Sequence, residues 1–225
     1  MNSSRLPDEI VVVNDSGPKE LRDMLLKLEK KTKLIYAYIL PDIPWNYNGA
    51  CNLGVWLSTG SVIALEDSDH IPGRDAYKEG MKILEERPEV SRVHYQRYWM
   101  PIAEVMNKSY EDWQKGTPIG PNQMVSLFRR SVYLTLKGQD ERLCGRYGYM
   151  AYDWVFKYKF VLKLKSERAN FYYIVKDGSE PDMERKMSSE NRRFYAGNVG
   201  EWERNNDWRH SPHGILNFQY IYEAL

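Results

Sequence analysis

Three short apolar runs in the first 65 residues, separated by stretches of helical periodicity, constrain the fold of this chain most strongly. The first run, residues 10–13, contains only isoleucine and valine and leads into Asn-Asp-Ser-Gly-Pro, which is typical of a fully buried strand followed by a turn. Apolar residues then recur at helical spacing over residues 19–31. Further strands are predicted at 34–40 and 61–65, on either side of a short helix at 48–57. This alternation is typical of an α/β fold built on parallel strands.

The rest of the chain continues the pattern less regularly. A helix is predicted at 74–87, where a proline follows, and a strand at 90–99. Two glycines and two prolines in residues 115–122 indicate a loop. A last strand is predicted at 171–175 and a helix at 189–198. At 225 residues, and with about 150 residues per domain as a guide, the chain is expected to form a single domain.

Charge and composition exclude several classes of protein. Lys and Arg number 32 and Asp and Glu 31, so the net charge of +1 offers no positive surplus for binding nucleic acid. No apolar run approaches the roughly 18 residues of a membrane span, and the start of the chain lacks the apolar centre of a signal peptide. We therefore expect a cytoplasmic protein without a transmembrane segment. The two cysteines, Cys51 and Cys144, are too far apart in the sequence to indicate a zinc site.

Acidic residues follow two of the predicted strands. Asp67 and Asp69 flank a serine directly after the strand at 61–65, and ligands of open α/β sheets bind at the carboxyl ends of strands. Such a pair suits Mg²⁺ or Mn²⁺, although a solvated Asp/Ser turn is the more frequent meaning of this short pattern. Asp15 follows the first strand, where its carboxylate either accepts a hydrogen bond from a base or ribose or makes an Asx turn or helix cap.

Taken together, three segments resemble the family 2 glycosyltransferases of GT-A fold. They are residues 8–17, which end in an acidic-Gly turn, residues 48–54 with Asn-Gly-Ala-Cys-Asn-Leu-Gly, and residues 60–72 with Asp-Ser-Asp. The family usually has arginine where this chain has Cys51. The resemblance implies a mixed, mainly parallel sheet flanked by helices, with a nucleotide-sugar-binding half at about 1–100.

The second half, at about 101–225, is similar to the acceptor half of the family. The similar segments are residues 127–133, 138–142 and 149–154. The resemblance makes Asp153 the catalytic base, while Tyr152 replaces the glutamate that usually precedes it.

The resemblance also implies a reaction and its ligands. A nucleoside-diphosphate sugar, with UDP favoured, would donate a sugar to a hydroxyl of a glycan, glycoprotein or glycolipid, with inversion. The implied donor-binding residues are Asp15, Asn48, Asn52 and Asp67, and the implied ligands of Mn²⁺ or Mg²⁺ are Asp69, Asp67 and His210, with His213 as a second choice for the histidine. Residues considered for stacking on a pyranose, each of which also suits ordinary packing, are Trp45, Tyr47, Trp99 and Trp113.

The sequence is compatible with two other hypotheses about function. One is a decayed transferase that binds a nucleotide sugar or carbohydrate without catalysis, which Tyr152 favours. The other is a nucleotidyltransferase, a class that shares the sheet and the acidic pair but generally has a Gly-rich basic loop near its start.

Overall fold

The computed structural model describes most of the chain, and it divides the chain into two compact units. The described residues are 3–28, 31–101, 103–104, 112, 116–120, 122, 124–161, 165–175, 187–205 and 218–225. Unit 1 consists of Met1–Leu6, Val62–Val132 and Leu164–Glu184, and unit 2 of Pro7–Ser61, Tyr133–Lys163 and Arg185–Leu225. Each unit therefore combines segments that are far apart in the sequence.

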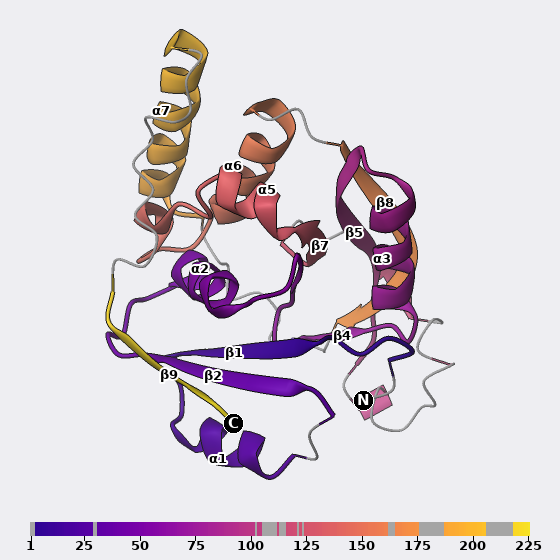
Figure 1. Cartoon of the computed structure of the whole chain (residues 1–225). Helices are drawn as coiled ribbons and strands as arrows, with labels where there is room; N and C mark the ends of the chain where they lie inside the picture. The colour runs from indigo at the N-terminus through magenta and orange to yellow at the C-terminus, as the bar shows by residue number, and fades with distance from the viewer. Residues whose placement is uncertain are drawn as a thin grey trace. The chain divides into compact units, whose positions relative to one another are not determined.

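The sheet of unit 2 has three strands in the order β1-β2-β9 (Figure 1). These are β1 (Glu9–Asp15), β2 (Lys33–Ile39) and β9 (Tyr220–Ala224). β1 and β2 are parallel, as the sequence predicted, whereas β9 runs antiparallel to β2. The helix α2 (Tyr47–Leu57) covers one face and packs Leu53 against Ala37 and Ile39. β9 was not predicted, because its alternating tyrosines lie in a polar tail that has little apolar periodicity.

The prediction that the first strand is fully buried was wrong. Most residues of β1 are only partly buried, because β1 is an edge strand whose neighbour in the described sheet is β2. The helix α1 (Glu20–Leu26) that follows contains no buried residue, and its Met24 is 63% exposed. The apolar spacing correctly indicated a helix here but did not indicate how little of it would be covered.

The helices of unit 2 pack around an aromatic core. They include η2 (Glu141–Leu143), α6 (Met150–Phe156), a π-helical turn η3 (Lys157–Val161) and α7 (Ser189–Asn205). Trp154 of α6 is fully buried, with ring centroids 4.9 Å from Tyr133 and 6.4 Å from Tyr158. These contacts fix the helix that also carries Asp153.

Truncating this core should measurably destabilise the protein. Trp154→Ala is expected to lower the free energy of unfolding by about 3–5 kcal/mol, because it removes buried surface and leaves a cavity. Trp56, on α2 of the same unit, is 55% exposed. Trp56→Ala is therefore the matched control, with an expected change within about 0.5 kcal/mol. Urea unfolding measures both, and equal losses in the two variants would contradict the packing described.

The sheet of unit 1 is mixed. Its path is β3 (Val62–Leu65), β7 (Ser126–Arg129), β5 (Val90–Trp99), β8 (Lys165–Val175) and β4 (His70–Pro72), and β6 (Thr117–Ile119) pairs with β5. β5 and β8 are parallel, and the other pairs in the described sheet are antiparallel. β6 lies within the stretch that was predicted to be loop alone.

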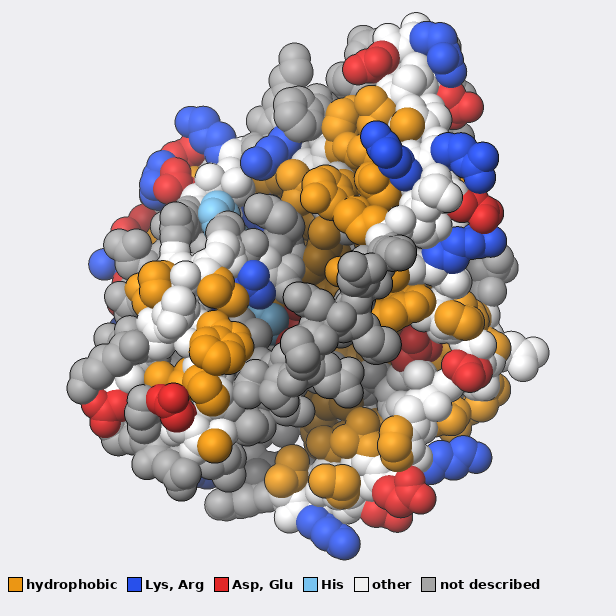
Figure 2. All heavy atoms as spheres, turned by 180° about the vertical axis from the view of Figure 1, so that it is seen from behind, with side chains coloured by type: hydrophobic (Ala, Val, Ile, Leu, Met, Phe, Trp, Pro, Cys, Tyr) orange, Lys and Arg blue, Asp and Glu red, His pale blue; other side chains and the backbone are white. Residues whose placement is uncertain are grey.

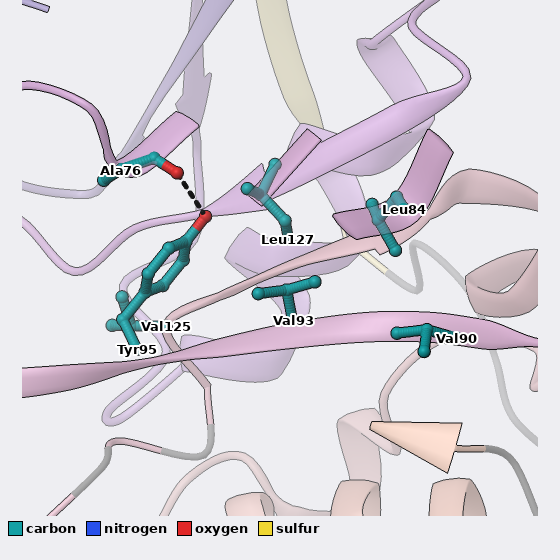
Figure 3. Close-up of a cluster of buried hydrophobic side chains, with 7 residues drawn as sticks. All are labelled: Ala76, Leu84, Val90, Val93, Tyr95, Val125 and Leu127. Atoms are coloured by element: carbon teal, nitrogen blue, oxygen red, sulfur yellow. Dashed lines mark hydrogen bonds between the residues drawn. The ribbon is translucent and has the colours of Figure 1, made fainter. Parts of the chain in front are cut away.

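The helix α3 (Ala76–Glu86) packs on this sheet and completes the core of unit 1. Figure 3 shows the buried cluster, which consists of Ala76, Leu84, Val90, Val93, Tyr95, Val125 and Leu127. The hydroxyl of Tyr95 donates a hydrogen bond to the carbonyl oxygen of Ala76 at 3.3 Å, so the buried phenol has a partner.

The predicted fold class, mixed α/β with sheets flanked by helices, is confirmed. The expectation of a mainly parallel sheet was wrong, because parallel pairs in the described chain are confined to β1/β2 and β5/β8 and the other described pairs are antiparallel. β3, expected to continue the parallel arrangement, pairs antiparallel with β7 instead. None of the helices in the described part of the chain has the length and apolar composition needed to cross a membrane.

Candidate active site

The two aspartates of the Asp-Ser-Asp motif lie in a tight turn between β3 and β4 of unit 1. The turn is closed by the backbone N–H of His70, which donates to the carbonyl oxygen of Asp67 at 3.0 Å. One carboxylate oxygen each from Asp67 and Asp69 and one ring nitrogen of His70 all lie within 4.8 Å of one another. The short strand β4 then pairs with β8, which anchors the end of the turn in the sheet.

The carboxylate of Asp69 is held by its neighbour in the sequence. Nδ1 of His70 lies 2.7 Å from Oδ1 of Asp69, and Nε2 of the same ring lies 3.1 Å from Nη1 of Arg97 on β5. An arginine can only donate, so Nε2 accepts and the ring proton is assigned to Nδ1, where it is donated to Asp69. The hydrogen bond from His70 is the main reason that the pKa of Asp69 lies below its ordinary value.

Asp67 is held from another segment. The amide Nδ2 of Asn122 donates to Oδ2 of Asp67 at 2.5 Å. The side chains of Asp67 and Asp69 are 21% and 55% exposed, whereas that of His70 is 3% exposed. The turn is thus held by hydrogen bonds from His70 and Asn122, and its carboxylates are still partly exposed.

This donor set suits a hard or borderline divalent cation. Carboxylate oxygens are the preferred ligands of Mg²⁺, and Mn²⁺ accepts both carboxylate and imidazole. The residues present in the described turn therefore fit the metal that the sequence resemblance implied.

Among its contacts in the described chain, Asp15, at the end of β1 in unit 2, caps neither α1 nor α2. The side chain that holds the backbone at this point is that of Asn14, whose Oδ1 accepts from the backbone N–H of Gly17 at 2.7 Å. Oδ1 of Asp15 instead accepts from Nδ2 of Asn46 at 3.0 Å. Burial raises the pKa of Asp15, and the nearby charge of Asp42 adds to the rise. Asp15 is therefore a partly buried acceptor at a strand end, and its role in donor binding stays a prediction.

Asn48 and Asn52, one helical turn apart on α2, reach a turn that follows α5 (Arg130–Thr135). Nδ2 of Asn48 donates to the carbonyl oxygen of Asp140 at 2.7 Å. Nδ2 of Asn52 donates to the carbonyl oxygen of Gln139 at 2.9 Å and to Oε1 of Glu141 at 2.7 Å. Both asparagines are buried, so the structure uses them to hold the turn, and their predicted contact with a donor stays a prediction.

The side-chain oxygen of Asn52 is hydrogen-bonded as well. Its Oδ1 accepts from the hydroxyl of Tyr133 at 2.6 Å and from the backbone N–H of Gln139 at 2.9 Å. A Cβ on Gly138, whose φ is +71°, would come within 2.6 Å of the same oxygen. The glycine of the Gly-Gln-Asp-Glu segment is therefore required both by its backbone conformation and by the approach of Asn52.

Asp153 lies in a buried cluster of charges in unit 2. Its Oδ2 is 2.6 Å from Nζ of Lys157, one turn later, with both side chains about 95% buried; the angles are not those of a good hydrogen bond. Burial raises the pKa of Asp153, and the ammonium of Lys157 offsets part of the rise. The charges of Asp140 and Arg142 also act on it, in opposite directions. A carboxylate with a raised pKa is a stronger base than an exposed aspartate.

Asp140 is the second buried acid of this cluster. Both of its oxygens accept from Arg142, at 2.9 Å from Nε and 2.7 Å from Nη2. Asn198 of α7 adds a longer contact at 3.3 Å, and the guanidinium of Arg142 lies 4.4 Å from the ring centroid of Phe194. The guanidinium of Arg142 compensates the charge of Asp140, whereas the ammonium of Lys157 is the main compensation for the charge of Asp153. Sequence reasoning did not single out Lys157, although its i,i+4 spacing from Asp153 is a detectable signal.

Aromatic side chains gather near Asp153 in unit 2. The ring of Tyr149 lies 5.6 Å from that of Tyr152 and 5.7 Å from that of Tyr195, and Tyr152 is 56% exposed. Asp153 contributes to the raised pKa of Tyr195, after burial. Figure 2, which views the molecule from behind, shows hydrophobic side chains gathered in patches on that side. Among the predicted stacking residues, Trp45 is 45% exposed and packs against Tyr147 at 5.0 Å.

Several predicted residues lie outside the described part of the chain. They are His210 and His213, one of which was expected to complete the metal site, and Trp113. The structure thus brings Asp67 and Asp69 together in unit 1, and it places Asp15, Asn48, Asn52 and Asp153 in unit 2.

Comparison with known proteins identifies the class to which this fold and site belong. The chain belongs to glycosyl transferase family 2, whose family model matches residues 1–137, more than half of its length. It is accordingly a glycosyltransferase, and the predicted family and enzyme class are confirmed.

The fold is also similar to that of a solved glycosyltransferase. The catalytic domain of Drosophila β1,4-galactosyltransferase 7, crystallised with xylobiose, matches with a TM-score of 0.50 and 12% sequence identity. The match covers 96% of this chain and 86% of that one. At this identity the likeness concerns the fold. None of the curated proteins searched matches this chain.

Proposed function

We propose that this protein is a metal-dependent glycosyltransferase that moves a sugar from a nucleoside-diphosphate sugar, UDP-sugar being favoured, to an acceptor hydroxyl with inversion. The observation that carries the proposal is the turn after β3, where the carboxylates of Asp67 and Asp69 converge in a chain of family 2. The acceptor belongs to a glycan, glycoprotein or glycolipid.

The residues of this chain have distinct roles in the proposed reaction. Asp69 and Asp67 would hold Mn²⁺ or Mg²⁺, Asp67 would also reach the ribose, and Asp15 would contact the base of the nucleotide. The chemistry that such a cation would supply is the neutralisation of charge on the departing diphosphate. His210 is proposed as a further ligand.

Asp153 is proposed to act at the acceptor. It takes the proton of the acceptor hydroxyl while the oxygen forms a bond to the anomeric carbon and the bond to the diphosphate breaks. In-line attack inverts the configuration at that carbon. The raised pKa of Asp153 supports this role. Burial destabilises the ionised carboxylate, so protonation of this side chain is more favourable than protonation of an exposed aspartate.

Release of nucleoside diphosphate tests the proposal directly. The full chain is incubated with a panel of UDP-, GDP- and dTDP-sugars and Mn²⁺, and the free diphosphate is measured with and without a chelator. Metal-dependent release from at least one donor is expected. If donors raise the melting temperature but no nucleoside diphosphate is released, the result would instead favour a decayed transferase that binds the nucleotide sugar without catalysis.

The pH dependence of turnover should report the pairing of Asp153 with Lys157. The base works ionised, so activity is lost as the pH falls through its pKa, which burial raises above the ordinary value. Lys157→Met removes the ammonium that counteracts this rise, so the acid limb of the pH profile is expected to move to higher pH. Lys157→Arg, which keeps a positive charge, should move it less. A profile unchanged in Lys157→Met would contradict the role of Asp153 as the titrating base.

A further inference from the structure

The two carboxylates of the metal-binding turn are held by side chains that lie outside the Asp-x-Asp motif itself. Asp69 accepts from His70, His70 accepts from Arg97, and Asp67 accepts from Asn122. Arg97 comes from β5, and Asn122 from a segment more than 50 residues after the motif, so the arrangement depends on the tertiary structure of unit 1.

His70 occupies the centre of this arrangement with both ring nitrogens engaged. Its Nδ1 is hydrogen-bonded to Asp69 at 2.7 Å and its Nε2 to Arg97 at 3.1 Å. A neutral imidazole ligates a metal through a nitrogen lone pair, and here the proton lies on Nδ1 while the lone pair of Nε2 faces a guanidinium. His70 thus belongs to the acidic cluster by distance but is used as a bridge between Arg97 and Asp69.

Arg97 and Asn122, which hold the two carboxylates through His70 and directly, are themselves held by hydrogen bonds to the backbone. Nε of Arg97 donates to the carbonyl oxygen of Gly120 at 2.7 Å. Oδ1 of Asn122 accepts from the backbone N–H of Met124 at 2.9 Å, so both ends of this amide are used. A carboxylate held through anchored partners loses less freedom when it binds a cation.

We propose that Arg97, His70 and Asn122 are positioning residues that orient the carboxylates of Asp69 and Asp67 for a divalent cation, and that His70 is not itself a ligand. This inference rests on the metal site of the proposed function. The guanidinium of Arg97 also places a positive charge near two carboxylates that would otherwise repel each other.

Binding of Mn²⁺ to the full chain tests the proposal without a turnover assay. The signal of free Mn²⁺ in electron paramagnetic resonance gives the dissociation constant, measured with Mn²⁺ alone and with UDP present. Arg97→Gln and His70→Ala are each expected to weaken Mn²⁺ binding by about 10- to 100-fold, the usual effect of removing a partner of a ligand. Asn122→Ala should act similarly through Asp67.

Two further variants separate positioning from general loss of structure. Arg87→Gln removes a 45%-exposed arginine of the same unit, which pairs with Glu89 and Glu167, and should leave Mn²⁺ binding unchanged. His70→Asn keeps an N–H donor near the position of Nδ1 and should recover much of the affinity lost in His70→Ala, whereas a ligand role for the ring predicts no such recovery.

The outcomes distinguish this inference from the proposed function. If the wild-type chain binds Mn²⁺ and the variants at 97, 70 and 122 bind it within twofold of wild type, the positioning role is wrong and the metal site stands. If the wild-type chain binds no Mn²⁺ in either condition, the metal site of the proposed function is wrong and the positioning role falls with it.

Discussion

Asp153→Asn is expected to lower the turnover of glycosyl transfer by about 10²- to 10⁴-fold, the contribution of a general base, while donor binding changes little. The asparagine has nearly the same shape as the aspartate but cannot accept the proton of the acceptor hydroxyl. Because Asp153 is buried beside Lys157, the substitution also leaves an uncompensated ammonium, so the folded state of the variant must be verified.

The measurement combines a rate with a binding constant. Nucleoside-diphosphate release in the presence of acceptor gives the turnover, and calorimetry with UDP and Mn²⁺ gives the affinity for the donor portion. Asp8, an exposed aspartate of the same unit, supplies the isosteric control Asp8→Asn, which should match wild type in both. Wild-type turnover in a folded Asp153→Asn variant would remove Asp153 from the mechanism.

Asp69→Ala is expected to abolish metal-dependent donor binding and to lower turnover by about 100-fold or more, because it removes a carboxylate proposed to hold the cation directly. Asp69 is the most exposed member of the acidic cluster and accepts from His70, so its loss costs little packing. The variant should therefore fold with a melting temperature close to that of wild type.

Calorimetric titration of UDP with and without Mn²⁺ measures this effect. In the wild-type chain Mn²⁺ should strengthen UDP binding, and in Asp69→Ala it should make no difference. Glu86→Ala removes an exposed carboxylate of α3 in the same unit and should behave as wild type. An equal response to Mn²⁺ in wild type and Asp69→Ala would show that the cation, if bound, is held elsewhere.

Most helices and strands near the start of the chain were predictable from local pattern. Local pattern predicts β1 from the apolar run before Asp15, and it predicts α2 and α3 from the spacing of their apolar residues. Glycines and prolines near these elements indicate where they end. β9 and β6 were missed because neither carries a clear local pattern: β9 alternates tyrosines in a polar tail, and β6 is three residues beside glycine. Both are strands because a neighbouring strand supplies hydrogen bonds to them.

The candidate site likewise contains residues that local sequence predicts and residues that it does not. Asp67 and Asp69 could be identified because the motif is contiguous and follows a strand, and Asp153 because its surroundings resemble those of a known family. Arg97 and Asn122 could not be identified, since they are 28 and 53 residues after Asp69 and no spacing relates them to it. The same holds for Asn48 and Asn52, whose buried amides hold a turn some 90 residues later.

Residues close in the chain were enough to establish the α/β class, the family and the acidic turn, because periodicity and short motifs are properties of neighbouring residues. Strand direction, the burial of Asp153 beside Lys157 and the support of Asp69 by His70 and Arg97 arose only on folding. The physical reason is that hydrogen bonds and ion pairs act over a few ångströms, and which distant side chains come within that range is set by the packing of the whole unit.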